Sequence, residues 1–175
     1  MASRALPVKA AVLLAVAMGL TWACGSPAEG VFPDEIECVQ PAPVATSQRA
    51  PGSVSPQAYT ARMRSSSDTI ERLRSGLRAK YAEDTFYRRE AFRPDFAAYA
   101  DETICTAQGM LDLTAPDARF EKYEADLDAA LTALIEHTRA GREAVRARNV
   151  SDYRDWFKGA DAKIAAVRTA ANAVR

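Results

Sequence analysis

The sequence has little of the chemistry that most enzymes and metal sites require. Its 175 residues include one histidine and three cysteines, and 23 basic residues balance 23 acidic ones. One histidine excludes a cluster of imidazole ligands, and no Cys-x-x-Cys or paired Cys/His spacing indicates zinc, c-type haem or a redox dithiol. Zero net charge leaves no basic footprint for nucleic acid. No glycine-rich phosphate loop, Gly-x-Ser-x-Gly or Ser-x-x-Lys motif occurs. We therefore predict no metal, no cofactor, no nucleic-acid partner and no enzymatic activity.

The longest apolar run is too short to span a membrane comfortably. It extends from Ala10 to Ala23 behind Arg4 and Lys9, and the first 23 residues contain no acid. A spanning helix needs roughly 20 apolar residues. A basic start, a short apolar core and small residues near its end are typical of a secretory signal peptide, which we predict over residues 1–23. The alternative is a buried N-terminal helix.

The apolar run ends in the sequence Leu-Thr-Trp-Ala-Cys-Gly-Ser at residues 20–26. These residues resemble the lipobox of bacterial lipoproteins, in which a cysteine follows a small residue at the end of the signal. The resemblance implies that Cys24 is acylated, becomes the mature N-terminus and holds the protein on the outer side of a membrane. Thr21 stands where the family has leucine, and Trp22 is bulky for its position. The alternative is ordinary secretion, which would leave a free periplasmic or extracellular protein.

The number of cysteines agrees with this interpretation. Export places the chain where disulfides persist, and three cysteines leave one without a partner. If Cys24 carries lipid, Cys38 and Cys105 remain to pair with each other. Closing a loop of that length stabilises a fold by roughly 4 kcal/mol on a chain-entropy argument. The alternative is that Cys38 and Cys105 are two unpaired thiols.

Proline marks a linker between the signal and the body. Six of the nine prolines lie between Pro27 and Pro56, among serine, threonine, glutamine and alanine. This composition predicts an extended tether over residues 24–55, long enough to hold the body away from a membrane. Phe32, Ile36 and Cys38 interrupt its polarity, so we expect part of the tether to lie against the body.

Four segments after residue 55 carry the period of an amphipathic helix. Ser55 followed by Pro56 is typical of a helix N-terminus. The apolar spacing predicts helices over 56–82, 94–112, 115–147 and 151–174, and it predicts no strand. The expected inner face of the first helix is Tyr59, Met63, Ser66, Ile70, Leu73, Leu77 and Tyr81. We predict an all-α domain over residues 56–175, folded as an antiparallel four-helix bundle with short connections.

Several local devices are expected within these helices. Thr114 and Asp117 resemble a capping box at the start of the third helix, and Ser151 is the expected cap of the fourth. Gly141 is expected to cost the third helix about 1 kcal/mol relative to alanine.

Charged residues in the first helix are expected to pair within it and to face solvent. Asp68 with Arg72 and Glu71 with Arg74 have the spacings that bring side chains together on a helix surface. The excess of arginine and lysine from Pro56 to Arg89 has two interpretations. It pairs with the acid-rich stretch Asp95–Asp128 on neighbouring helices, or it contacts anionic lipid.

Three further features are weighed as candidate sites. His137 is expected at the surface, and the alternatives are a general base or an axial haem ligand opposite Met63 or Met110. The acidic stretch lacks the Asp-x-Asp-x-Asp-Gly loop of EF-hand calcium sites and is expected to be a solvated face. Trp156 is expected in the core, and the alternative is a place on an exposed partner surface.

These observations lead to one functional hypothesis with two alternatives. We expect an exported, lipid-anchored bundle that binds an envelope protein or another envelope component without catalysis. The alternatives are a bundle that holds a small apolar or haem-like ligand between its helices, and an enzyme with a dispersed carboxylate site. The hairpin from Leu111 to Val167 also resembles helical hairpins of many uncharacterised secreted proteins of high-GC bacteria, which implies no activity.

Overall fold

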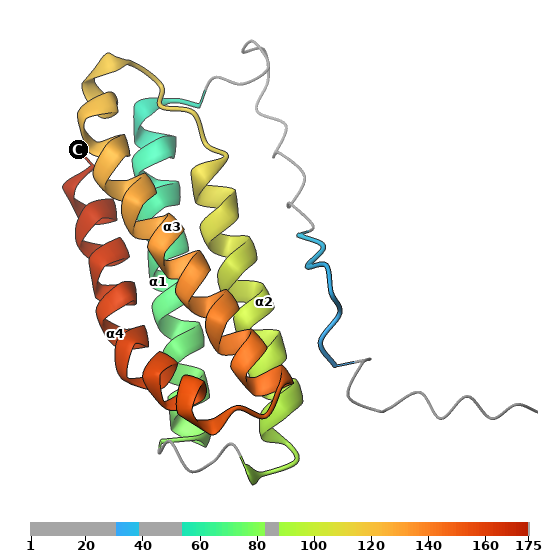
Figure 1. The fold of residues 1–175 in the computed structure, drawn as a ribbon. Helices are drawn as coiled ribbons and strands as arrows, with labels where there is room; N and C mark the ends of the chain where they lie inside the picture. The colour runs from blue at the N-terminus through green and yellow to red at the C-terminus, as the bar shows by residue number, and fades with distance from the viewer. Residues whose placement is uncertain (1–30, 39–53, 83–87, 175) are drawn as a thin grey trace, which may run out of the picture.

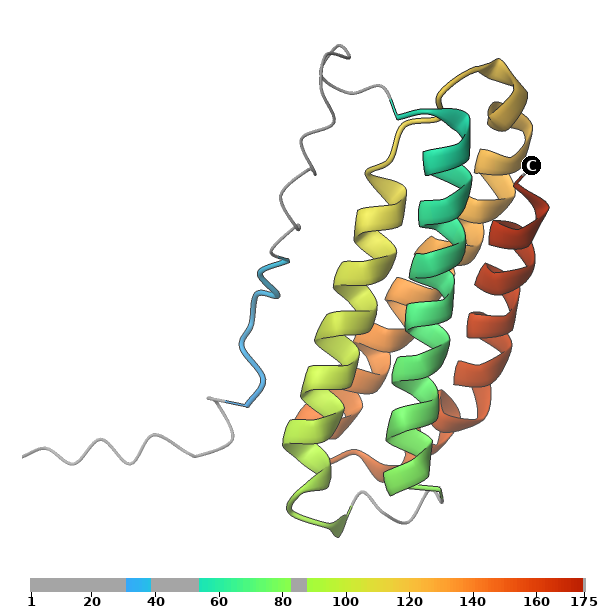
Figure 2. The same ribbon diagram turned by 180° about the vertical axis from the view of Figure 1, so that it is seen from behind.

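The computed structural model describes residues 31–38, 54–82 and 88–174. The described chain forms four helices, α1 (Pro56–Lys80), α2 (Phe92–Leu111), α3 (Ala118–Arg146) and α4 (Val150–Ala173). They run alternately up and down, and each packs against its two neighbours in the ring α1–α2–α3–α4 (Figures 1 and 2). The predicted all-α antiparallel bundle is confirmed. No helix in the described parts of the chain combines the length and apolarity that a membrane crossing requires.

The helix starts follow local capping chemistry, and two of them correct the sequence prediction. Ser55 caps α1 as expected, because its hydroxyl accepts a hydrogen bond from the Ala58 amide at 3.2 Å. Asp117 caps α3 by accepting from the Arg119 amide at 3.0 Å, so α3 begins three residues later than predicted and Thr114 is not its cap. The proline at 116 disfavours helical backbone in the residue before it, which delays the start.

The turn before α4 lies where the sequence predicts it, but the residue that caps the helix differs from the predicted one. Asn149, not Ser151, caps α4, because its side-chain oxygen accepts from the amides of Ser151 and Asp152 at 3.1 and 3.4 Å. Arg148 precedes it with a φ of 57°, the left-handed region that non-glycine residues seldom adopt. This residue reverses the chain between α3 and α4. Helix α2 begins at Phe92, two residues before the predicted start at 94. Phe92 is fully buried against Tyr81 at the end of the α1–α2 connection, which fixes this first turn.

The core consists of two clusters along the bundle. The first cluster lies toward the α2–α3 connection and is mostly aliphatic; it includes Met63, Ile70, Ile104, Met110, Leu127, Leu131, Leu134, Ile164 and Val167. The aromatic cluster lies toward the opposite end; it includes Phe32, Tyr81, Phe92, Phe96, Tyr99, Tyr153 and Trp156. In the aromatic cluster Phe96 packs edge-on against Trp156 with ring centroids 4.7 Å apart. Trp156 is thus a core residue, as expected.

The inner face of α1 differs from the predicted stripe. Ser67 and Arg74 are buried at positions where Ser66 and Leu73 were expected, and Leu73 is only partly buried. The predicted pair of Arg74 with Glu71 is wrong: Arg74 donates to Asp161 of α4 at 2.8 Å, while Glu71 pairs with Arg168 of α4 at 2.8 Å. The charges of α1 therefore connect it to α4, because helices in a ring bring oppositely charged surfaces side by side.

Gly141 has a packing role that the sequence did not indicate. A Cβ built on Gly141 would lie 2.5 Å from Cγ of Trp156 and 2.7 Å from its Nε1, so α3 approaches the indole too closely for any side chain. Glycine costs α3 the expected helix propensity, but position 141 requires glycine because no larger residue fits against Trp156.

Candidate functional site

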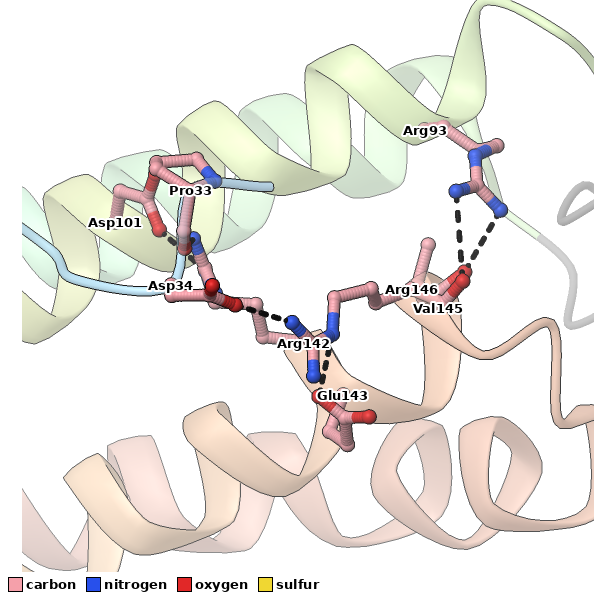
Figure 3. A network of polar contacts seen from close by, with 8 residues as sticks. All are labelled: Pro33, Asp34, Arg93, Asp101, Arg142, Glu143, Val145 and Arg146. Carbon is pink, nitrogen blue, oxygen red and sulfur yellow. Dashed lines mark hydrogen bonds and ion pairs between the residues drawn. The ribbon is translucent and has the colours of Figure 1, made fainter. Parts of the chain in front are cut away.

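Residues 31–38, which we call the strap, lie against α2 and α3, and Figure 3 shows Pro33 and Asp34 of the strap beside Arg142 and Arg146 of α3. A disulfide joins Cys38 at the end of the strap to Cys105 of α2, with Cα atoms 5.1 Å apart. The predicted pairing is confirmed, and the expectation that part of the linker lies against the body is confirmed with it. The predicted lipid site Cys24 and the signal segment 1–23 lie outside the described residues.

Phe32 anchors the other end of the strap. Its ring is 2% exposed and joins the aromatic cluster. The guanidinium of Arg93 lies 5.4 Å from the ring centroid and that of Arg142 lies 5.6 Å from it. Two cations against one ring stabilise its position, by about 0.5–2 kcal/mol each depending on how far they are desolvated.

Arg142 connects the strap to both helices of the groove. It is 7% exposed, donates to Asp101 of α2 at 2.7 Å and donates to the Pro33 carbonyl of the strap at 2.6 Å (Figure 3). A buried arginine needs such partners, because an unpaired buried charge costs several kcal/mol. Next to it Arg146 pairs with Asp34 of the strap at 2.6 Å. Glu143 first, and Asp34 after it, raise the pKa of Arg146.

A pocket of about 400 Å³ opens at the end of the bundle where the strap begins. Its charged and aromatic lining consists of Arg88, Arg89, Glu90, Arg93, Arg148 and Tyr153. We call it the arginine pocket. These residues come from the end of the α1–α2 connection, the first turn of α2, the turn between α3 and α4, and the first turn of α4, which the bundle places at one end (Figure 1).

The electrostatics of the arginine pocket favour an anion. Arg93 donates to the carbonyls of Val145 and Arg146 at 3.0 and 3.4 Å, which holds it at the C-terminal end of α3. Burial lowers the pKa of Arg93, and the charge of Arg148 lowers it further. The positive ends of the α2 and α4 dipoles and the negative ends of the α1 and α3 dipoles meet at this end of the bundle and oppose one another, so the positive field of the pocket comes from its arginines. Glu90 is the one carboxylate among the described lining residues.

A second polar feature lies at the junction of the two core clusters. Each helix contributes at least one buried side chain with a polar atom that has no hydrogen-bond partner among the described residues; these are Nη2 of Arg74 and the side-chain polar atoms of Tyr99, Thr103, Thr138 and Trp156. The guanidinium of Arg74 stacks on the Trp156 ring 5.1 Å from its centroid. Burial raises the pKa of Tyr99 to about 12, against the opposing charge of Arg74. We call this set the polar layer.

The histidine that the sequence singled out contacts this region from its edge. His137 is partly buried, a ring nitrogen lies 2.9 Å from the Trp156 carbonyl, and its ring stacks on the indole. Met63 and Met110, the residues weighed as its partners around a haem, are buried in the first cluster instead. The structure therefore assigns a packing contact to His137 and brings neither methionine into its cluster.

The acidic stretch has structural partners in place of a uniformly solvated face. Asp101 binds Arg142, and Asp95 accepts from Tyr81 at 2.9 Å and from Lys80 at 3.3 Å. Within the described ranges, no three His, Cys, Asp or Glu side chains come together as metal ligands would.

No family model matches this sequence, and neither a curated protein nor a solved structure matches it. Sequence reasoning anticipated the strap from its apolar residues but missed Arg93 and Arg142 as its holders. The one available signal was the spacing of Arg139, Arg142 and Arg146 on one side of α3, which also fits a helix C-terminus with favourable charges.

Proposed function

We propose that this chain is an exported, lipid-anchored helical bundle that acts as a non-enzymatic binding module of the cell envelope. The observation that supports it best is the disulfide between Cys38 and Cys105. Disulfides persist in extracytoplasmic compartments, and this pairing leaves Cys24 as the odd cysteine at the end of a signal-like segment. Acylation of Cys24 gives that residue a use.

The contacts of the strap add a mechanical argument. A disulfide, a buried phenyl ring and two arginine bridges tie residues 31–38 to α2 and α3. Force applied to an N-terminal anchor would reach the strap first, and the strap transmits it to the centre of the bundle through Cys105. Such an attachment suits a body that must remain folded while one end is fixed to a membrane.

The anchor is tested by fractionation and intact mass. The wild-type protein should sediment with membranes and carry acyl groups on an N-terminal Cys24. Two or more acyl groups anchor a protein stably to a membrane, whereas a single acyl group binds only marginally. Cys24→Ser should move it to the soluble fraction or leave an uncleaved precursor. The matched control is the double variant C38S/C105S, which loses the disulfide but keeps Cys24 and should stay with membranes. An unmodified N-terminus beyond residue 24 in the wild type would show simple secretion.

The binding role is tested by cross-linking the tagged chain in intact cells. A binding module should yield a reproducible partner that is lost when the body is unfolded. If no cross-linked species forms, and cells that lack the protein keep a normal envelope, the binding role is wrong.

A further inference from the structure

The strap shortens the link between the proposed anchor and the bundle. Because residues 31–38 are fixed to α2 and α3, the proposed anchor Cys24 is separated from the first fixed residue, Val31, by only seven positions. At 3.3–3.6 Å per residue this connection reaches about 25 Å at most. The sequence composition had indicated a tether over all of residues 24–55.

The place where the strap begins decides which end of the bundle meets the membrane. Phe32 packs beneath Arg93, and Val31 packs against the aromatic cluster, so the strap starts at the end that holds the arginine pocket. The 29 residues of α3 span about 44 Å at 1.5 Å per residue. A connection of about 25 Å cannot turn the far end of the bundle toward the bilayer while the strap stays docked.

The two ends of the bundle differ in charge, and the end nearer the proposed anchor is the one lined with arginines. The far end carries the α2–α3 connection and the start of α3, where residues 112–128 hold six acids and two basic residues. The near end carries the arginine pocket, whose described lining holds four arginines and one carboxylate. Arg148 in this pocket is exposed and forms no ion pair with a described carboxylate.

From these observations we propose that the arginine pocket binds the phosphate headgroup of an anionic phospholipid in the membrane that holds Cys24. The pocket then fixes the orientation of the body, with α2 and α4 starting at the membrane and the α2–α3 connection directed away from it. Guanidinium groups suit this ligand because their planar forks donate to phosphate oxygens in pairs. The orientation rests on the proposed lipid anchor, whereas the headgroup site does not.

The test uses the full chain carrying Cys24→Ser, expressed with its own N-terminal segment and purified from the soluble fraction. Its partition is measured by sedimentation onto phosphatidylcholine vesicles with and without phosphatidylglycerol. We expect binding to the anionic vesicles, weakened by salt, and little binding to phosphatidylcholine alone. Equal binding to both kinds of vesicle would overturn the headgroup site.

Charge-matched variants locate the site. R148Q should weaken binding to anionic vesicles about fivefold, the loss expected for one arginine near a charged surface. The control R64Q removes the same charge from an exposed position in the first half of α1, at the far end, and should leave binding unchanged. If R148Q folds poorly, R148N replaces it, because asparagine tolerates the left-handed backbone at this residue. Equal effects of the two substitutions would overturn the assignment.

Inorganic phosphate separates a lipid headgroup from a free anion. We expect phosphate to compete weakly with the anionic vesicles. Tight binding of phosphate without a preference for anionic vesicles would replace the proposed occupant with a soluble anion. Because every arm uses the unacylated chain, failure of the lipid anchor in the wild type does not alter these outcomes.

Discussion

Replacing Gly141 by alanine tests the packing of α3 against α4 where α3 lies directly against the Trp156 indole. The new Cβ would lie 2.5 Å from Cγ of Trp156 and 2.7 Å from its Nε1, distances that real carbon contacts do not reach. The indole has little room to move, because Phe96 lies against it with ring centroids 4.7 Å apart and Tyr153 with centroids 5.6 Å apart. On its other side lies the guanidinium of Arg74, 5.1 Å from the ring centroid. Either the helices separate or the aromatic cluster repacks.

The expected magnitude is the difference between two effects. Overpacking a close-packed core costs about 1–3 kcal/mol, and a clamped indole places this site near the upper value. Alanine returns about 1 kcal/mol of helix propensity, so the free energy of unfolding should fall by about 2 kcal/mol. At about 4 °C per kcal/mol, the melting temperature should drop by about 8 °C.

The assay is thermal and urea unfolding followed by circular dichroism, with G76A as the matched control. Gly76 has no atom within 4 Å of a built Cβ, so the same substitution there should raise the free energy of unfolding by up to about 1 kcal/mol. Opposite signs for one chemical change would isolate the contact with Trp156. A G141A protein that unfolds at or above the wild-type temperature would refute the reasoning.

Three further predictions concern the strap and the polar layer. C38S/C105S should lower the free energy of unfolding by about 4 kcal/mol in urea titrations, and reduction of the wild type should reproduce that loss. D161N should lower the free energy of unfolding by about 2 kcal/mol in the same titration, because it leaves the buried guanidinium of Arg74 without its carboxylate. The loss is limited because position 161 is half-exposed and water can reach it. The pKa of Tyr99 is raised to about 12, above its value near 10 in the unfolded chain. The stability that the protonated Tyr99 adds to the folded state is therefore fully present below pH 10 and is lost as the pH rises toward 12. Y99F should remove that alkaline loss in pH-dependent unfolding and should cost little at neutral pH, since its hydroxyl has no described partner.

Local patterns in the sequence were sufficient for the helices and for the disulfide. The period of apolar residues located all four helices because burying one stripe requires no knowledge of the partner. Ser55 followed by Pro56 located the start of α1 because a cap acts within one turn. Cysteine parity, with Cys24 set aside by the lipobox resemblance, predicted the pair Cys38–Cys105. Phe32 indicated that the linker docks, since an isolated aromatic residue in a polar segment needs something to pack against.

The sequence was least informative where a residue has two local solutions of similar energy. Thr114 and Asp117 both suit an N-cap, as do Asn149 and Ser151. Two good caps differ in free energy by much less than a helix loses when it has no cap at all. The choice was made by the proline at 116 and by the left-handed turn at Arg148. The arginine pocket was hidden for another reason: its arginines come from residues 88–93, around the start of α2, and from Arg148, more than 50 residues away, and each of these segments alone has the composition of an ordinary polar loop or helix end.

The amino-acid sequence by itself determined the helices, their approximate ends and the covalent link of the strap, because helix propensity, amphipathic period and cysteine number are local or countable properties. Only the tertiary structure decided which charges are buried and what they bind. Arg74 finds Asp161 across 87 residues of sequence, and Arg142 finds Asp101 across 41. An arginine at a helix surface has the same local energy whether it faces water or a carboxylate on another helix. The distinction exists only once α1 lies beside α4 and α2 beside α3.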